Sequence, residues 1–166
     1  MDQMNLPLII FQGIPETAIM VVLALVLTGH EAKLKDVLIV GVIGGLIGAV
    51  VRSLPISLGV NILIMLPIIG VLIAIFCKIG MLSAIIVAGI GAIVIGITET
   101  AYIFTFVKIT GITIKQIMSD LYTRLLFPLP EYAILILLIF ICKRYYWTLL
   151  NIREFNDIRR IKDYER

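Results

Sequence analysis

The sequence has few charged residues and few of the residue types that form most catalytic and metal sites. Lys, Arg, Asp and Glu make up 15% of the 166 residues, whereas about a quarter of an ordinary soluble domain is charged. There is one histidine, His30, and there are two cysteines, Cys77 and Cys142. One loop histidine with no cysteine nearby does not form a zinc-ligand pattern, and two thiols at the ends of apolar runs indicate no disulfide framework. We therefore expect no metal and no other cofactor.

Long polar stretches are also lacking, because apolar runs occupy most of the chain. Hydrophobic residues make up 61% of the sequence, and roughly 20 helical residues cross a hydrocarbon core about 30 Å thick. The candidate spans are residues 7–28, 37–51, 56–77, 81–107 and 132–141, the last extendable to Trp147 or beyond. Because lipid leaves the backbone to satisfy itself within helices, we predict an all-α polytopic transmembrane helix bundle over residues 1–150. Without a soluble domain, we expect no enzymatic activity.

The distribution of Lys and Arg predicts the orientation of the bundle. Five spans place the 30–36 loop, the turn after the third span and the C-terminal tail on one side, with ten basic residues against four on the other. Basic residues favour the cytoplasmic side, so we expect a cell-membrane protein with its N-terminus outside and its C-terminus in the cytoplasm. Two short helices in the 81–107 run, instead of one tilted helix, would change this count. Because the net charge of +3 comes from residues beside the spans, we expect the lipid bilayer as a partner and no nucleic acid.

Residues 113–127, before the last run, have an amphipathic pattern. Thr113 followed by Gln116 fits a capping box. Apolar residues then recur at helical spacing, and these are Ile114, Ile117, Met118, Leu121 and Leu125. We predict a helix that lies in the outer interface with its apolar face toward the lipid or that packs as a lid on the bundle.

Residues 151–166 form a second amphipathic segment. Its apolar residues, which recur among Arg and Asp, are Ile152, Phe155, Ile158 and Ile161. We predict that the last span continues out of the membrane into a cytoplasmic basic tail helix. Such a helix can pass a rotation or tilt to a partner, or it can anchor on anionic lipid.

Six polar residues lie within or beside the predicted spans, in the outer half of the bundle. Glu16 follows Pro15 well inside the first run, and Glu99 lies near the end of the fourth. An ionised carboxylate at such a depth is costly unless it is paired, hydrated or protonated. The other candidates are Gln12, Arg52, Asn61 and Arg124. These groups could bind a polar or peptide-like ligand, form internal ion pairs that fix helix register, or include a proton-coupled carboxylate of a transporter.

Small residues in the second and fourth runs predict close helix packing. Small side chains let helix backbones approach each other in lipid, where the hydrophobic effect does not drive association. In the second run they form two pairs, Gly41 with Gly45 and Gly44 with Gly48, and in the fourth run they are Ala88, Ala92 and Gly96. We expect these stripes to pack within one chain, and a homodimer seam is the alternative.

Several short motifs extend over nearly the whole chain. They are Gly13-Ile14-Pro15-Glu16, Val51-Arg52-Ser53-Leu54-Pro55 with Ser57-Leu58-Gly59, Gly111-Ile112-Thr113, and Leu121-Tyr122-Thr123-Arg124-Leu125-Leu126-Phe127-Pro128-Leu129-Pro130. Their order resembles the multipass membrane input domain at the head of many Firmicutes sensor histidine kinases of the GHKL-ATPase type. The resemblance implies signal perception, with Glu16, Arg52 and Arg124 as the motif positions involved. Such kinases have a phosphoacceptor helix and an ATP-binding domain after the last span, and neither follows here, so we expect a stand-alone sensor or the input half of a split or truncated kinase.

Three functions fit these features. The first is a sensor or regulatory membrane module that perceives a signal in its outer half and relays it through the C-terminal helix to a cytoplasmic partner, such as a histidine kinase or another signalling protein. The second is a substrate-binding membrane subunit of a small-solute transporter, in which Glu16 or Glu99 would be needed for uptake. The third is a structural or assembly protein whose ion pairs are purely internal. The family resemblance and the predicted exit helix favour the first.

Overall fold

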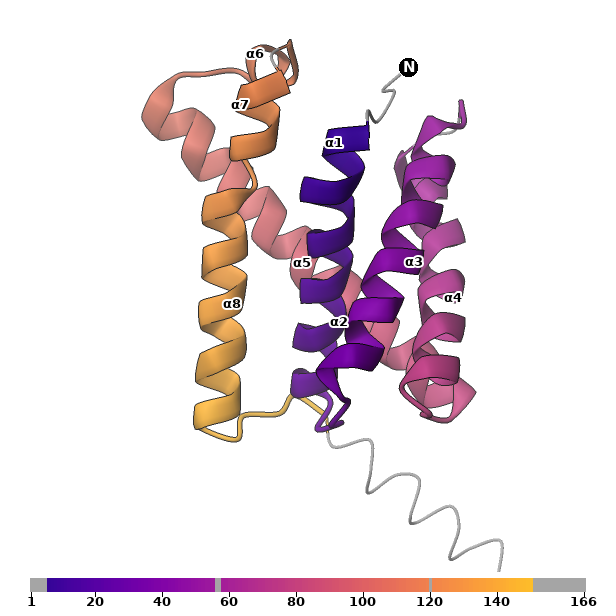
Figure 1. Cartoon of the computed structure of the whole chain (residues 1–166). Coiled ribbons are helices and arrows are strands. Elements are labelled where there is room, and N and C mark those ends of the chain that lie inside the picture. The colour runs from indigo at the N-terminus through magenta and orange to yellow at the C-terminus, as the bar shows by residue number, and fades with distance from the viewer. Residues whose placement is uncertain (1–5, 56–57, 120, 151–166) are drawn as a thin grey trace, which may run out of the picture.

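The computed structural model describes residues 6–55, 58–119 and 121–150, and all of the secondary structure in these ranges is helical. In chain order the helices are α1 (Leu6–Leu8), η1 (Ile9–Gly13), α2 (Ile14–Leu27), α3 (Leu34–Ser53), α4 (Leu58–Phe76), α5 (Met81–Thr110), α6 (Ile114–Ser119), α7 (Leu121–Leu126) and α8 (Leu129–Arg144) (Figure 1). Five segments are long and apolar enough to cross a membrane. The predicted all-α bundle with five candidate spans is therefore confirmed.

The fourth span is one long helix. The 30 residues of α5 measure about 45 Å at a rise of 1.5 Å per residue. Because a hydrocarbon core is only about 30 Å thick, α5 has to cross at a tilt, and Figure 1 shows it running obliquely behind the other helices. Gly111 ends the helix in the left-handed conformation, with φ 69°, which glycine adopts without steric cost. A single tilted helix leaves the predicted number of spans unchanged.

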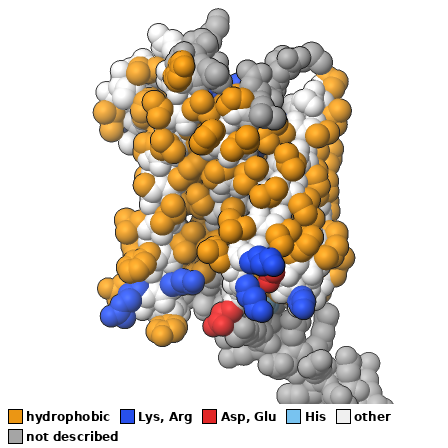
Figure 2. Space-filling view, viewed as in Figure 1, with side chains coloured by type: hydrophobic (Ala, Val, Ile, Leu, Met, Phe, Trp, Pro, Cys, Tyr) orange, Lys and Arg blue, Asp and Glu red, His pale blue; other side chains and the backbone are white. Residues whose placement is uncertain are grey.

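The bundle has two ends, which are distinguished by the connections between the helices. The start of α1, the end of α3, the end of α5 and both α6 and α7 lie at one end, here called the N-terminal side (Figure 1). The α2–α3 turn, the α4–α5 turn and the end of α8 lie at the other end, the C-terminal side. In Figure 2, Lys and Arg side chains gather at the C-terminal side, and apolar side chains cover most of the face above them. The bundle thus has an apolar belt with a basic margin at one end.

The outer surface of the bundle is apolar, as a lipid-facing surface requires. Leu63 on α4 is 72% exposed, and Ile93 and Phe104 on α5 are similarly open. In water, an apolar surface this extensive would favour aggregation or partner binding, whereas in a bilayer it faces lipid tails. These exposed side chains therefore agree with the membrane assignment.

α2 is the central helix, because it packs against α3, α5 and α8. One core cluster joins α2, α3, α4 and α5, and its fully buried members include Val21, Val40, Ile73 and Val87. A second cluster joins α2 to α5 and α8 through Leu23, Ile95, Leu135 and Cys142. Helices from both ends of the sequence are thereby fixed around the first span.

The contact between α2 and α3 depends on glycine. A Cβ atom at Gly41 would lie 2.7 Å from the Cβ of Ala18, and one at Gly45 would lie 2.9 Å from the backbone of Ile14. Both distances are shorter than side chains tolerate, so these two positions let the α2 and α3 backbones approach closely.

The other two glycines of the α3 stripe face α2 and α4. A Cβ atom at Gly44 would lie 2.6 Å from the Ile69 side chain on α4 and 2.9 Å from the Thr17 side chain on α2. At Gly48 the nearest neighbour is the end of the Met65 side chain, at the ordinary contact distance of 3.4 Å. Only the first of these two positions is too crowded for a larger residue.

The small residues of α5 are not equivalent. Ala88 is buried in the core, and a Cβ atom at Gly91 would lie 3.0 Å from side-chain atoms of Met20 and Ala24. Ala92 is only partly buried, and a Cβ atom at Gly96 would meet no atom within 4 Å. The inward face of α5 therefore includes Gly91, which the sequence pattern did not single out, and Gly96 lies off that face.

The predicted amphipathic helix is present on both sides of Asp120, which lies outside the described residues, as α6 and α7. The capping box is confirmed, because the Thr113 amide donates to Gln116 Oε1 at 2.8 Å and the Gln116 amide donates to Thr113 Oγ1 at 3.4 Å. Ile117 is only 1% exposed and lines a cavity inside the bundle. The inward position of Ile117 agrees with the lid alternative, whereas Ile114 and Leu126 are 49% and 62% exposed, so the interfacial alternative stays a prediction.

The last span begins earlier than the sequence predicted. α8 begins at Leu129, three residues before the predicted start at residue 132, with Pro130 in its first turn and Pro128 as its N-cap residue. Proline suits the first turn of a helix, because the amide hydrogen that it lacks has no partner there. The two prolines thus begin a span as well as ending the segment before it.

The predicted continuation of this span into the tail is wrong for residues 145–150. α8 ends at Arg144, and Tyr146 has φ 52°, a left-handed conformation that a right-handed helix does not contain. The amides of Leu149 and Leu150 then donate to the Leu27 carbonyl at the end of α2, at 2.7 Å and 3.3 Å. The predicted tail helix over residues 151–166 lies outside the described residues.

Candidate functional site

A polar cavity lies inside the bundle near the N-terminal side, between the first span, α5 and α8. Its volume is about 60 Å³, which leaves room for a few water molecules, because one needs about 10–15 Å³ on this measure. Its polar walls are Gln12, Glu16, Glu99, Glu131 and Tyr132. Apolar side chains close the rest, among them Ile95, Ile117 and Leu135. Carboxyl groups from three spans therefore share one small volume in an apolar bundle.

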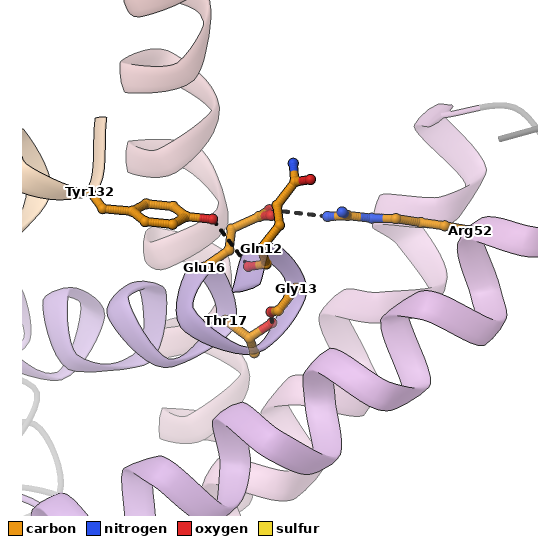
Figure 3. Close-up of polar contacts among 6 residues, drawn as sticks. All are labelled: Gln12, Gly13, Glu16, Thr17, Arg52 and Tyr132. Atoms are coloured by element: carbon orange, nitrogen blue, oxygen red, sulfur yellow. Dashed lines mark hydrogen bonds and ion pairs between the residues drawn. The ribbon is translucent and has the colours of Figure 1, made fainter. Parts of the chain in front are cut away.

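Glu16 forms an ion pair with Arg52 on α3 (Figure 3). Arg52 Nη2 donates a hydrogen bond to Glu16 Oε1 at 3.0 Å. Arg52 lies in the last turn of α3, at the helix end that a positive charge favours, and Glu16 lies in α2 just after the π-helical turn. The side chains of Arg52 and Glu16 are 41% and 27% exposed. The pair thus links two spans at the margin of the cavity and is only partly shielded from its surroundings.

A π-helical turn in the first span contributes backbone atoms to the site. Within this turn, Ile9–Gly13, the Gln12 carbonyl accepts a hydrogen bond from the Tyr132 hydroxyl of α8 at 3.1 Å (Figure 3). The Gly13 carbonyl accepts one from the Thr17 hydroxyl at 2.8 Å. Two side-chain donors therefore satisfy carbonyls near the point where the helix changes register, and π-helical turns are frequent at functional sites.

Glu131 is a cavity residue that the sequence analysis missed. Its residue surface is only 7% exposed, and within the described part of the chain no hydrogen bond or ion pair joins its carboxyl group to another residue. The prediction began the last span at residue 132 and so left Glu131 in a loop. A usable signal was the repeated Pro-Glu pair, because Pro15-Glu16 begins α2 and Pro130-Glu131 begins α8.

Apart from the amide N–H groups of Gln12, most polar atoms of the cavity wall are hydrogen-bond acceptors. In their ionised form, the carboxylates of Glu99 and Glu131 accept hydrogen bonds and donate none. The Gln12 Oε1 atom is buried and has no hydrogen-bond partner among the described residues. The donors of Tyr132 and Arg52 are directed at the Gln12 carbonyl and at Glu16. An occupant that matches this wall is therefore a hydrogen-bond donor or a cation.

Direct chelation of a metal by several side chains is not supported where the structure is described. In those ranges, no group of three His, Cys, Asp or Glu residues is close enough together to hold a metal ion. The carboxyl groups of the cavity are instead placed around a space that water can share.

Two of the predicted site residues lie away from the cavity. Asn61 is buried on α4, and its Oδ1 atom has no hydrogen-bond partner among the described residues. Arg124 is partly buried on α7. Neither lines the cavity. Of the other four candidates, Gln12, Glu16 and Glu99 lie on the cavity wall, and Arg52 lies beside it.

Aromatic contacts lie beside the N-terminal side of the cavity. The Tyr102 hydroxyl on α5 donates to the Phe127 carbonyl at 2.7 Å. The Phe106 and Phe127 rings meet edge to face, with centroids 5.0 Å apart and planes at 90°, an arrangement that aromatic pairs prefer. These contacts attach the segment before α8 to α5, and Ile114 and Ile117 of α6 line the same cavity.

Comparison of the chain with protein families, curated proteins and solved structures gives no match. The resemblance of the sequence motifs to kinase input domains therefore stays a hypothesis.

Proposed function

We propose that the chain is an integral membrane sensor or regulatory module that perceives a signal at the cavity and relays it through its C-terminal segment to a cytoplasmic partner. The observation that supports this most strongly is the connection of α8 to the first span at both ends. Near the cavity, the Tyr132 hydroxyl is bonded to the Gln12 carbonyl at 3.1 Å. At the C-terminal side, the Leu149 amide is bonded to the Leu27 carbonyl at 2.7 Å.

The double connection gives a route for a signal. Glu131 and Tyr132 on α8 face Gln12 and Glu16 of the first span across the cavity, so an occupant or a change of charge there alters the forces between the two spans. Helix shifts of about 1–2 Å are common in switching proteins. Because residues 145–150 join the end of α8 to the end of α2, such a shift reaches the start of the tail.

The basic margin supports the orientation in this proposal. Lys33, Lys35, Lys78, Lys143 and Arg144 all lie on the C-terminal side of the described bundle. The positive-inside rule favours the cytoplasm for this side, which puts the cavity in the outer half of a bacterial cell membrane. The resemblance to kinase input domains supports a histidine kinase or a response regulator as the partner.

The proposed function is tested by affinity purification from native membranes in a mild detergent. The tagged full chain is compared with a variant that lacks residues 152–166, and co-purifying proteins are identified by mass spectrometry. We expect a histidine kinase or another signalling protein to be recovered with the full chain and lost with the shortened one. A shortened chain that folds and retains the same partner would contradict relay through the tail.

The alternative proposal is the substrate-binding membrane subunit of a small-solute transporter. It is supported by the cavity itself, because carboxyl groups inside a membrane bundle are characteristic of solute and proton pathways. It predicts that ATPase or transport subunits are recovered in the same purification, and that Glu16→Gln or Glu99→Gln lowers solute uptake. Uptake that is unchanged in both variants would count against it.

A further inference from the structure

We infer that the cavity between the first span, α5 and α8 is a binding site for a small monovalent cation, with Glu131 as the residue that holds it. This inference assigns a ligand class to the site of the proposed function and therefore rests on it. Two observations apart from the cluster of carboxyl groups point to an occupant. They are the low exposure of Glu131, 7% for the whole residue, with no ion pair or hydrogen bond of its carboxyl group to another described residue, and the buried Gln12 Oε1 atom, which also has no hydrogen-bond partner among the described residues.

The charge balance of the cavity favours a positive occupant. Arg52 is paired with Glu16 at 3.0 Å, which leaves Glu99 and Glu131 on the cavity wall without a cation from the described ion pairs. An ionised carboxyl group at a depth of this kind is costly unless a positive charge, a proton or water stabilises it. An ionised carboxyl group is more costly at Glu131 than at Glu99, because Glu131 is 7% exposed whereas Glu99 is exposed at the surface of its helix.

The ligand atoms on the wall determine which cations fit. Carboxylate and amide oxygens bind hard cations that prefer oxygen ligands, and these oxygens also accept hydrogen bonds from an ammonium group. A divalent ion such as Ca²⁺ takes about 6–8 oxygen ligands, and the described residues contain no set of three side chains that could chelate a metal. An ion with a single charge that keeps part of its water shell needs fewer oxygen ligands from the protein.

The cavity volume limits the size of the occupant. About 60 Å³ holds a sodium, potassium or ammonium ion with a few water molecules, because each water needs about 10–15 Å³ on this measure. A bulky organic cation such as choline does not fit the same space. Choline chloride is therefore a suitable salt for keeping ionic strength constant without filling the site.

The test measures thermal unfolding of the full chain in detergent micelles at fixed pH and ionic strength. Sodium, potassium or ammonium chloride replaces choline chloride stepwise, and the transition midpoint is followed. We expect one of these ions to raise the midpoint in a saturable manner, since a ligand that binds only the folded state stabilises it. The rise should be lost in Glu131→Gln and retained in the matched control Glu31→Gln, whose carboxyl group lies in the exposed α2–α3 turn.

The comparison is of the shift caused by the ion in each variant, so a change in starting stability does not affect it. If Glu131→Gln fails to fold, Gln12→Leu removes the unmatched oxygen without changing the charge and should weaken the saturable shift. Midpoints that are equal in all salts, whether or not they follow pH, would overturn the cation site. An equal shift in Glu131→Gln and in the unsubstituted chain would also overturn it.

The outcomes separate the cation site from the proposed function. A tail-dependent signalling partner together with no cation effect refutes the site and leaves the sensor proposal standing. A Glu131-dependent cation effect together with no signalling partner refutes the sensor proposal and leaves the site standing.

Discussion

The hydroxyl group of Tyr132 donates a hydrogen bond to the backbone carbonyl of Gln12 at 3.1 Å and so joins the last span to the π-helical turn of the first. We expect Tyr132→Phe to lower the free energy of unfolding by about 0.5–1.5 kcal/mol, the usual net value of one hydrogen bond. Unfolding in mixed micelles with increasing SDS measures the change. Tyr145→Phe is the matched control, because Tyr145 is 76% exposed. Equal stability of the two variants would show that the hydrogen bond contributes nothing.

The glycines of α3 and α5 predict a contrast between two alanine substitutions. Gly45→Ala places a Cβ atom 2.9 Å from the Ile14 backbone, and overpacking of this kind costs about 1–3 kcal/mol. Gly96→Ala meets nothing within 4 Å, so its effect should stay within about 0.5 kcal/mol. The same SDS titration compares the two. A larger loss for Gly96→Ala would mean that this face of α5 packs against something else, such as a second copy of the chain.

The ion pair of Glu16 with Arg52 predicts a measurable coupling between the two spans. Because the side chains are 27% and 41% exposed, we expect a coupling free energy of about 0.2–1 kcal/mol, the range of partly solvated pairs. A double-mutant cycle with Glu16→Gln and Arg52→Gln measures it. A second cycle with Glu31→Gln and Arg52→Gln should give additive effects. If the charge-exchanged chain, with Glu16→Arg and Arg52→Glu, regains full stability and function, the pair is structural and has no part in perception.

The proposed orientation predicts which ends of the helices can be labelled from outside. In a chain with Cys77→Ser and Cys142→Ala, one new cysteine is placed on either side, as Ile112→Cys or Glu31→Cys. Both positions belong to exposed connections at opposite ends of the bundle. A membrane-impermeant maleimide should label the first in intact cells and the second only after permeabilisation. The reverse pattern would place the cavity on the cytoplasmic side.

Hydropathy predicted the spans well because the physical requirement is local. Each of the five runs has to form its backbone hydrogen bonds within its own helix and contain few charged residues. Composition alone therefore locates each run. The ends of the last span were misjudged because other parts of the chain decide them. Pro130 lies in the first turn of α8 instead of only stopping the helix before it. After the turn at Tyr146, the amides of Leu149 and Leu150 donate to the carbonyl of Leu27, which is far away in the sequence.

The candidate site was predictable only in part for the same reason. Glu16 and Glu99 are recognisable because a carboxyl group inside an apolar run is conspicuous, and both lie on the cavity wall. Glu131 sits at a helix boundary, where acidic residues are ordinary, and its burial depends on residues distant in sequence, such as Ile117 of α6 and Gln12 of the first span, which line the same cavity. Asn61 and Arg124 were predicted as site residues because they lie on the same side of the membrane as Glu16. They do not line the cavity, since a shared side of the membrane does not bring side chains into one cavity.

The most direct test of the relay is the distance between the start of α3, where the α2–α3 turn ends, and the end of α8 at the C-terminal side. Spin labels at Lys33→Cys and Lys143→Cys, in the chain with Cys77→Ser and Cys142→Ala, report it by pulsed electron resonance in lipid bilayers. We expect Glu131→Gln, which changes the charge at the opposite end of α8, to shift or broaden this distance distribution by about 1–2 Å, while Glu31→Gln leaves it unchanged. Identical distributions in all three chains would contradict the relay of a signal from the cavity to the tail.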